Sequence, residues 1–474
     1  MDFYDINDRS IRVSFKQAVL KGINAKTSGV FMPSEIGKLS PSMIYRNPPL
    51  SFREIVFEIS KMFCGDEITD ADLMQIIAQF YPYRIPITPI APTTYILELF
   101  HGGTCNYKDI GAGFAAYFME YLNRRENEPL NIIFASSGEG ACAAGAAVSH
   151  VKGVNAIILY PQNSLTEIQE KVLSSTAKNV YCLAVDGSLE DCERIVNTAL
   201  GDAELEKKTK FVPYGPLSIA PLIPQIAFFV YASLSVLYRC GYDNKIEHPD
   251  IIASVPSGTF SSLLSGIIAK KMGVPITGFI SAENKNHFAS DFLTSGSFDL
   301  KPLEKTNTPA LNPANPVNFS RMLELYSFNE LKRLIIPYWL DDERTVEAVS
   351  ACNDKTGYII DPYGGTAWQA WQDIYHGALN SLHLKDAEDS TLTGVPAKYS
   401  GIETWFQSSS KSNLTGIIFQ TSHPAKFPDV MKKAVGRPPS LPYKLESLPY
   451  RSDKAVSMPS SYDGFKEWFL NTVL

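Results

Sequence analysis

The middle of the chain alternates short apolar runs with longer segments of helical spacing. The runs without polar alternation lie at residues 131–135, 154–160, 180–185, 250–255, 275–280 and 415–419. Apolar residues recur every three or four positions in the segments between many of these runs, such as 189–200 and 260–272. Strands that have no polar face and alternate with helices are typical of parallel sheets covered on both sides. The pattern predicts an α/β protein.

Other stretches flank or interrupt this region. Residues 52–63 and 70–80 have helical spacing, and the proline-rich stretch 82–92 that follows them is typical of a domain boundary. Residues 295–316 are rich in Pro, Asn and Thr. Because compact domains seldom carry long idle loops, we expect this segment to form an ordered connection over a cleft. Residues 382–413 form a polar region that is rich in serine.

Charge and cysteine content narrow the class of protein. The chain has 474 residues, which is long enough for two or three domains. Its 43 Lys and Arg stand against 50 Asp and Glu, and the net charge of −7 leaves no positive excess to neutralise a phosphate backbone. We therefore expect no nucleic-acid partner. Its seven cysteines include no C-x-x-C pair, so neither a zinc site nor a disulfide framework is indicated, and a reducing compartment fits best.

Residues 217–238 carry no formal charge and are the one stretch to compare with a membrane span. They include Pro221, Pro224 and Gln225, so a buried core helix is the better interpretation. The chain opens with Asp2, Asp5 and other polar residues and has no basic segment leading into an apolar one, so no signal peptide is predicted. We expect a soluble, cytoplasmic protein without a membrane partner.

Three segments have residues suited to chemistry. In the first, ELFHGGTCNYKDIGAGF at 98–114, Lys108 lies in a turn rich in Gly, Thr and Asn with apolar residues on both sides. A lysine in a partly dehydrated pocket can lose its proton and attack a carbonyl group, which forms a Schiff base. The alternative from the residues alone is a solvated Lys-Asp pair at a helix start.

The other two segments are turns of small residues between a predicted strand and a predicted helix. ASSGEGACAAG at 135–145 offers hydroxyl and backbone N–H groups to a carboxylate or a phosphate, and SVPSGTFSSLLSG at 254–266 does the same. The alternative is a turn that allows close helix–sheet packing. No Walker A motif, no G-x-G-x-x-G after a strand and no H-E-x-x-H occurs, so neither a nucleotide nor a metal is indicated.

Taken together, the order and spacing of these motifs resemble the threonine synthase family, whose members use pyridoxal 5′-phosphate (PLP) and have fold type II. The resemblance is carried by VSFKQAV followed by GVFMP, by ELFHG-T---KD-G, by SVPSG-F and by TSHPAKF at 421–427. It extends over nearly the whole chain and is to the long bacterial and fungal form. It implies an N-terminal, mainly helical domain (1–92) and two doubly wound parallel-sheet domains that flank the cofactor, a large one (93–125 and 211–474) and a small one (126–210).

The resemblance also implies roles for residues that match the family's motifs. Lys108 would bind PLP covalently and then shuttle protons. Thr421 would be a neutral hydrogen-bond partner of the pyridine nitrogen, and Glu139, which stands where the family has Asp, would lie against the cofactor. The residues that would cradle the cofactor phosphate are Gly258, Thr259, Phe260 and Ser261. Those that would bind the substrate are Ser136, Ser137, Gly138, Asn318 and Arg321.

Departures from the family's motifs gather where the substrate is expected. The family's N-S-I-N-x-x-R element, which the resemblance implies helps to bind a substrate phosphate, reads GPLSIAP at 215–221. Its arginine has become Pro221, and both asparagines are gone. Each charge-assisted bond to a phosphate contributes roughly 1.5–3 kcal/mol, so this loss would weaken phosphate binding by orders of magnitude.

Three functional hypotheses follow. The leading one is a PLP-dependent lyase that converts O-phospho-L-homoserine and water to L-threonine and phosphate, as the resemblance implies. The second is a PLP-dependent enzyme that eliminates or replaces a group on a different amino acid, and the third is a PLP-binding paralogue without this turnover. In each case the expected partner is a small amino acid, and the chain is either a monomer or a homodimer.

Overall fold

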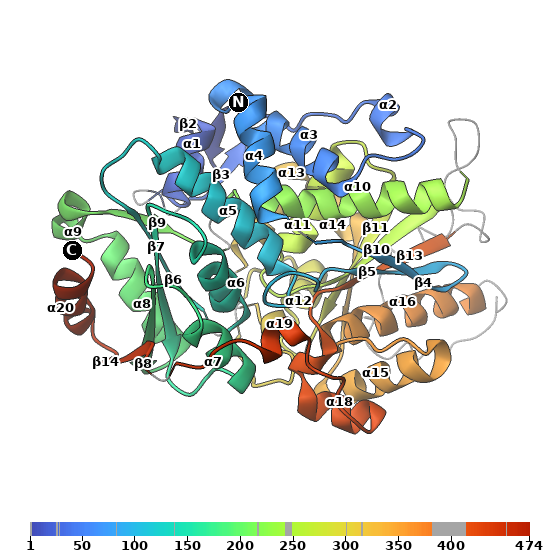
Figure 1. The fold of residues 1–474 in the computed structure, drawn as a ribbon. Helices are drawn as coiled ribbons and strands as arrows, with labels where there is room; N and C mark the ends of the chain where they lie inside the picture. The colour runs from blue at the N-terminus through green and yellow to red at the C-terminus, as the bar shows by residue number, and fades with distance from the viewer. Residues whose placement is uncertain are drawn as a thin grey trace.

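Two sheets of mainly parallel strands form the body of the computed structural model, with the N-terminal helices above and between them (Figure 1). The structure describes residues 2–24, 27, 29–81, 83–136, 138–215, 218–241, 249–299, 301–313, 316–381, 414–451 and 453–474. The serine-rich region predicted at 382–413 lies outside these residues.

The larger sheet has six strands in the order β12-β11-β10-β13-β5-β4. The strands are β12 (Ile335–Trp339), β11 (Ile276–Glu283), β10 (Asp250–Pro256), β13 (Leu414–Gln420), β5 (Thr94–Glu98) and β4 (Ile87–Ala91). All neighbours are parallel except β4, which forms an antiparallel pair with β5. The helices α10 (Leu222–Arg239) and α11 (Ser261–Lys271) cover one face, and α15 (Asp342–Thr356) and α16 (Pro362–Ser381) lie on the other (Figure 1).

The smaller sheet is wholly parallel, with the strand order β14-β8-β7-β6-β9. Its strands are β14 (Ala455–Pro459), β8 (Val180–Asp186), β7 (Val154–Pro161), β6 (Leu130–Ala135) and β9 (Lys210–Pro213). The helices packed around it are α5 (Lys108–Asn123), α6 (Glu139–Val148), α7 (Glu167–Ser174), α8 (Leu189–Leu200), α9 (Ala203–Lys208) and α20 (Tyr462–Thr472). Both sheets therefore have the covered parallel arrangement that the apolar runs predict.

The N-terminal region is not purely helical. Its strands β1 (Phe3–Asp5), β2 (Arg12–Val13) and β3 (Phe31–Pro33) form a three-stranded antiparallel sheet. Its helices are α1 (Phe15–Lys21), α2 (Pro41–Ile44), α3 (Phe52–Cys64) and α4 (Asp70–Phe80). Strands of two or three residues are too short to show a periodicity, which is why the sequence pattern misses them. Packing of α3 on α10 and of α4 on α5 ties this region to the body of the molecule.

The sheets divide the chain differently from the predicted domains. β4 belongs to the larger sheet, so this part of the predicted 1–92 domain joins the large one. β14 is a strand of the smaller sheet and α20 packs beside it on β14 and α8. The sequence predicts residues 211–474 to lie in the large domain. β14 pairs with β8 in parallel, with Ala455 opposite Cys182, and local sequence does not reveal a partner so far away in the chain.

Helix α10 is long and apolar enough to cross a membrane, but 78% of it is buried inside the protein. It packs against α3, α5 and α11, which agrees with the predicted core helix. The connection predicted over a cleft, residues 295–316, follows α12 (Phe288–Ser295), includes the short helix η2 (Pro309–Leu311) and leads to α13 (Val317–Leu325). Its described part is held by the Asn284 side chain, whose Nδ2 donates to Thr306 Oγ1 and to Thr308 O, both at 3.0 Å.

Four further elements complete the C-terminal half of the chain. They are α14 (Phe328–Leu334), η4 (Pro424–Lys426), α18 (Pro428–Val435) and α19 (Tyr443–Glu446). Of these, α14 packs on β12 and α18 on α15. η4 begins directly after the segment 421–423, which runs antiparallel to residues 105–107. This pairing brings the C-terminal motif against the lysine motif.

Candidate active site

A cavity of about 340 Å³ lies between the two sheets. Its walls come from segments that follow the carboxyl ends of parallel strands: 107–112 after β5, 135–143 after β6, 214–225 after β9 and 259–261 after β10. Ligands of open α/β folds bind in the crevice outside the carboxyl ends of the strands. The location is therefore that of an active site.

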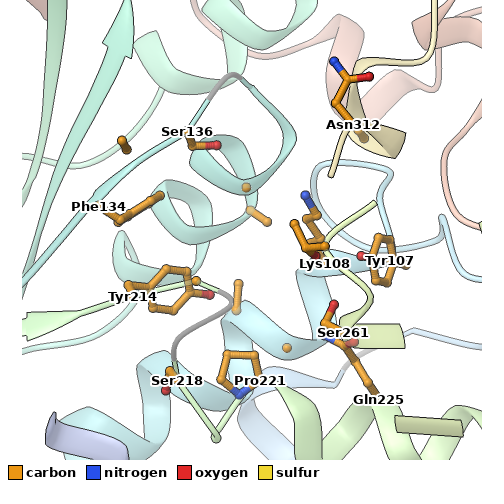
Figure 2. A pocket seen from close by; sticks show the side chains of 18 of the residues that line it. Tyr107, Lys108, Phe134, Ser136, Tyr214, Ser218, Pro221, Gln225, Ser261 and Asn312 are labelled. Atoms are coloured by element: carbon orange, nitrogen blue, oxygen red, sulfur yellow. The ribbon is translucent and has the colours of Figure 1, made fainter. Parts of the chain in front are cut away.

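Lys108 is the first residue of α5 and lines the cavity. The turn before it is fixed by Tyr107 N, which donates to Thr421 O at 2.8 Å, and by Asn106 Nδ2, which donates to Ser422 Oγ at 2.8 Å. Its side chain reaches toward the smaller sheet, since a Cβ atom built on Gly140 would lie 4.0 Å from Lys108 Nζ. In Figure 2, Lys108 points into the open space between the two halves of the molecule.

The residue after the lysine has a structural role. Asp109 is partly buried, and its carboxylate accepts hydrogen bonds from Thr104 N at 2.9 Å, Thr104 Oγ1 at 2.5 Å and Asn106 N at 3.4 Å. Burial raises the pKa of this carboxyl above its usual range, against the effect of these donors. Asp109 thus holds the turn that presents Lys108, and the alternative of a solvated Lys-Asp pair does not apply.

A buried ion pair lies beside this turn. Glu139 pairs with Lys426, with side chains only 6% and 3% exposed, and Lys426 Nζ also donates to Thr104 O at 3.1 Å. The second Glu139 oxygen accepts from Gln169 Nε2 at 3.2 Å. Glu139 is not among the cavity-lining residues, so the structure does not support the predicted cofactor contact. It joins α6 to the lysine motif and to the C-terminal motif instead.

The loop from Ser257 to Ser262 closes the cavity at the start of α11. A Cβ atom on Gly258 would lie 2.1 Å from Ala310 O, so only glycine allows this close approach. Phe260 has a left-handed backbone with φ of 57° and is buried. Gly258, Thr259, Phe260 and Ser261 all line a narrow slot that continues the cavity between Lys108 and Thr421. The backbone of this loop meets the N-terminus of an eleven-residue helix, which is a site for an anion.

Ser262 also lines this slot and was not predicted. Its hydroxyl oxygen is buried and makes no hydrogen bond to the residues that the structure describes. A buried hydroxyl without a partner is costly unless a ligand binds it. Its only sequence signal was that it follows the loop directly.

Ser136 lies at the opposite side of the cavity, at the start of α6. Its Oγ accepts hydrogen bonds from Ala141 N at 3.1 Å and Gly138 N at 3.4 Å, which leaves its proton for a ligand. Gly138 has a φ of 146° and serves as the N-cap of the ten-residue helix. The hydroxyl and the helix start together suit a carboxylate. The predicted Ser137 lies outside the described residues.

Asn318 and Arg321 do not line the cavity. Both are fully buried on α13, behind the glycine loop. Asn318 Nδ2 donates to Thr259 O at 3.0 Å, and Arg321 donates to Asn318 Oδ1 at 2.9 Å and to Phe31 O at 3.3 Å. In place of the predicted contact with substrate, they support the loop from below. A sequence motif can show that a polar residue belongs to a site, but not whether its side chain lines the cavity or lies behind the residues that do.

The wall across from Lys108 has a different character. It includes Phe134 and Tyr214, whose ring centroids are 5.0 Å apart, together with Ser218 and Pro221 (Figure 2). Glu193 of α8 and Asn312 of the 295–316 connection also line the cavity. Periodicity predicted the elements that carry Phe134 and Glu193, and Asn312 lies in the connection predicted to run over a cleft. Tyr214 lies outside the predicted elements.

Comparison with known proteins covers nearly the whole chain. The model of the threonine synthase N terminus matches residues 2–81, that of pyridoxal-phosphate dependent enzymes matches 91–382, and that of the threonine synthase C-terminal region matches 400–468. This chain belongs to the threonine synthase family of pyridoxal-phosphate dependent enzymes. The family and the fold type implied by the sequence motifs are confirmed.

Individual members of the threonine synthase family align from end to end. Threonine synthase of Buchnera aphidicola subsp. Baizongia pistaciae is 29% identical over 450 residues, which is 94% of each chain. The crystal structure of threonine synthase from Escherichia coli is similar with a TM-score of 0.82 at 26% identity, covering 99% of this chain and 100% of the other. The yeast enzyme has a TM-score of 0.82 at 22% identity, which shows the shared fold.

The residues of the slot fit PLP, the cofactor of this family. Lys108 Nζ supplies the amine that such a cofactor requires, and the loop 258–261 at the start of α11 supplies backbone N–H groups for its phosphate. The unpartnered Ser262 hydroxyl is a further donor at this end. Thr421, buried and neutral, lines the slot as the predicted partner of the pyridine nitrogen.

Proposed function

We propose that this chain is a PLP-dependent lyase that removes a substituent from the γ-carbon of an L-amino acid and adds water at the β-carbon. The reaction of the family is the conversion of O-phospho-L-homoserine and water to L-threonine and phosphate, and O-phospho-L-homoserine is the first compound to assay. The observation that carries the proposal is the position of Lys108, which faces the glycine loop on one side and Ser136 on the other.

The residues have distinct tasks in this reaction. The Ser136 hydroxyl and the N-terminus of α6 bind the substrate α-carboxylate, which orients the Cα–H bond toward Lys108. Lys108 Nζ removes the α-proton and transfers protons in the later steps. Bound PLP supplies the electron sink that stabilises the resulting negative charge. The Asp109 and Thr104 hydrogen bonds keep the lysine turn rigid during these transfers.

The proposal also covers setting and partner. The ligand is a small amino acid, because Ser136 Oγ and the N-terminus of α6 offer a site for its carboxylate within the cavity that Lys108 lines. We infer a cytoplasmic enzyme from the biosynthetic enzymes to which the chain is similar. A monomer and a homodimer both agree with the fold.

Replacement of Lys108 tests the proposal. Lys108→Ala should abolish both the visible absorbance of lysine-bound PLP and the release of product, with a loss of at least about 10³-fold in rate. Lys207→Ala, an exposed residue of α9, is the matched control and should keep both. Survival of the absorbance in Lys108→Ala would show that another lysine holds the cofactor.

A second candidate is supported by a specific observation. Pro221 lines the cavity at the position where the family has an arginine. A PLP-dependent elimination or replacement on an amino acid other than phosphohomoserine is therefore the alternative.

A further inference from the structure

The altered segment 215–221 presents its changed positions to the cavity. Gly215, Ser218 and Pro221, which replace the two asparagines and the arginine of the family's element, all line it. Ile219 and Ala220 are buried and do not. The spacing of three therefore places the positions of both lost asparagines and of the lost arginine on the surface that a substrate side chain would meet.

The side chains on this surface are uncharged. The rings of Phe134 and Tyr214 lie at 51° to each other and form an aromatic wall, and Pro221 lies beside them (Figure 2). Burial raises the pKa of Tyr214 far above its usual range, so its hydroxyl stays uncharged. Ser218 Oγ and Gln225 Oε1 are buried, line the cavity and make no hydrogen bond to described residues. The Ser218 hydroxyl can donate a hydrogen bond to the carbonyl oxygen of a neutral ligand.

The charges around the cavity disfavour an anionic side chain. Among the described lining residues Lys108 is the only cation, and its amine is engaged by the cofactor. Glu193 adds a carboxylate, whose pKa burial and the nearby Glu190 raise. Arg321 lies behind the glycine loop and donates to Asn318 and Phe31. A phosphate dianion would enter this site without a charged partner and would lose its hydration.

We propose that the γ-substituent of the substrate is an uncharged acyloxy group, so that the substrate is an O-acyl L-homoserine rather than a phosphorylated amino acid. The inference rests on the proposed lyase function. In the step, the Cγ–O bond breaks, the acyl group leaves as its carboxylate, and water adds at the β-carbon. O-acetyl-L-homoserine and water would thus give L-threonine and acetic acid, with no oxidant or reductant.

Three esters of L-homoserine test this, because the substituent on their γ-carbon carries a different charge in each substrate. The holoenzyme is assayed for threonine with the acetyl ester (neutral), the succinyl ester (one negative charge) and the phosphate ester (two). We expect kcat/KM to fall in that order, with at least about a tenfold difference between the acetyl and phosphate esters. The saturation constants, measured from the change in cofactor absorbance, should rise in the same order.

A substitution that restores the cation gives an independent test. Pro221→Arg should raise the ratio of kcat/KM for the phosphate ester to that for the acetyl ester by about tenfold or more, as one charge-assisted bond would. Pro221→Gln, which has similar reach without charge, should change this ratio less than about twofold. If Pro221→Arg does not retain the cofactor, Ser218→Lys places a cation on the same surface.

The outcomes separate the inference from the function on which it rests. A preference of the wild type for the phosphate ester, or no gain in any cation variant that retains PLP, would overturn the inference and leave the lyase function standing. Absence of threonine from all three esters, with the absorbance of lysine-bound PLP intact, would overturn both.

Discussion

The two ends of the cavity differ in how closely the chain packs around them. At the cofactor end, backbone atoms approach so closely that side chains have no room, as at Gly258, and the lysine turn is tied by hydrogen bonds to the segment 421–423. At the substrate end, the wall 214–221 presents a phenol, a hydroxyl and a proline ring around open space. The substrate end has lost the two asparagines and the arginine of the family's element. At the cofactor end, Thr259 and Ser261 stand where the family has Asn and Gly, and both still offer hydrogen-bond donors.

The difference shows where a fold restricts its sequence. Contacts between backbone segments allow few residue types, because any added atom must displace main chain. A side chain that faces a cavity can change without disturbing its neighbours, and it then alters only what the cavity binds. A fold therefore restricts the residues that pack tightly around a cofactor more than those that face a substrate.

The largest effect concerns the ion pair beneath the cofactor end. Glu139→Ala leaves Lys426 buried without its partner and should lower the free energy of unfolding by about 3–5 kcal/mol. Chemical denaturation of the holoenzyme measures it. Lys61→Ala, which breaks an exposed pair with Asp70, should cost less than about 1 kcal/mol. Equal losses in both variants would mean that Glu139 does not tie the cofactor end together.

The next effect tests the close approach at the glycine loop. Gly258→Ala should weaken PLP binding about 100-fold, because its Cβ would lie 2.1 Å from the backbone oxygen of Ala310. Titration of the apoprotein with PLP measures the affinity. Gly103→Ala is the matched control, because its Cβ would meet nothing within 4 Å, and its affinity should be unchanged. A tight-binding Gly258→Ala variant would remove the distinction between the two ends.

A pH effect probes another buried group at the cofactor end. Burial raises the pKa of Asp361, whose Oδ1 accepts from Tyr363 N at 3.0 Å, to about 7. The folded protein then keeps a proton that the unfolded chain releases, so stability is lost as the pH rises toward 7. This group should lower the free energy of unfolding by about 1.4 kcal/mol per pH unit between about pH 4 and 7.

Asp361→Asn should remove that dependence. The difference between the unfolding midpoints measured at about pH 5 and at about pH 7 should therefore be smaller in this variant than in the wild type. Asp299→Asn, an exposed residue after α12, should follow the wild type. If the unfolding midpoint of the wild type changes between about pH 5 and 7 by the same amount as that of Asp361→Asn, the raised pKa of Asp361 is contradicted.

The smallest effect sharpens the description of the substrate end. Glu193→Gln removes the carboxylate that lines the cavity and should raise kcat/KM for O-phospho-L-homoserine about two- to fivefold at low salt. The value for the acetyl ester should not change. Glu206→Gln, on exposed α9, serves as the control. An equal gain for both esters would show that charge does not govern this end.

Much of the fold was readable from local pattern. Apolar runs placed β6, β7, β8, β10 and β13 to within a few residues, and α8 begins and ends at the predicted residues 189 and 200. The motifs placed Lys108, the glycine loop and Thr421, which the structure brings to one slot. These features depend on residues near one another in the chain, where periodicity and turn chemistry act.

Local sequence is enough to identify the family, the cofactor, the parallel sheets and the lysine. The packing of distant segments pairs Glu139 with Lys426, places Arg321 behind the glycine loop and joins β14 to the smaller sheet. It also makes Gly215, Ser218 and Pro221 line the cavity beside Phe134 and Tyr214. Burial and charge pairing depend on which distant segments pack together, and short-range sequence patterns do not reveal that packing.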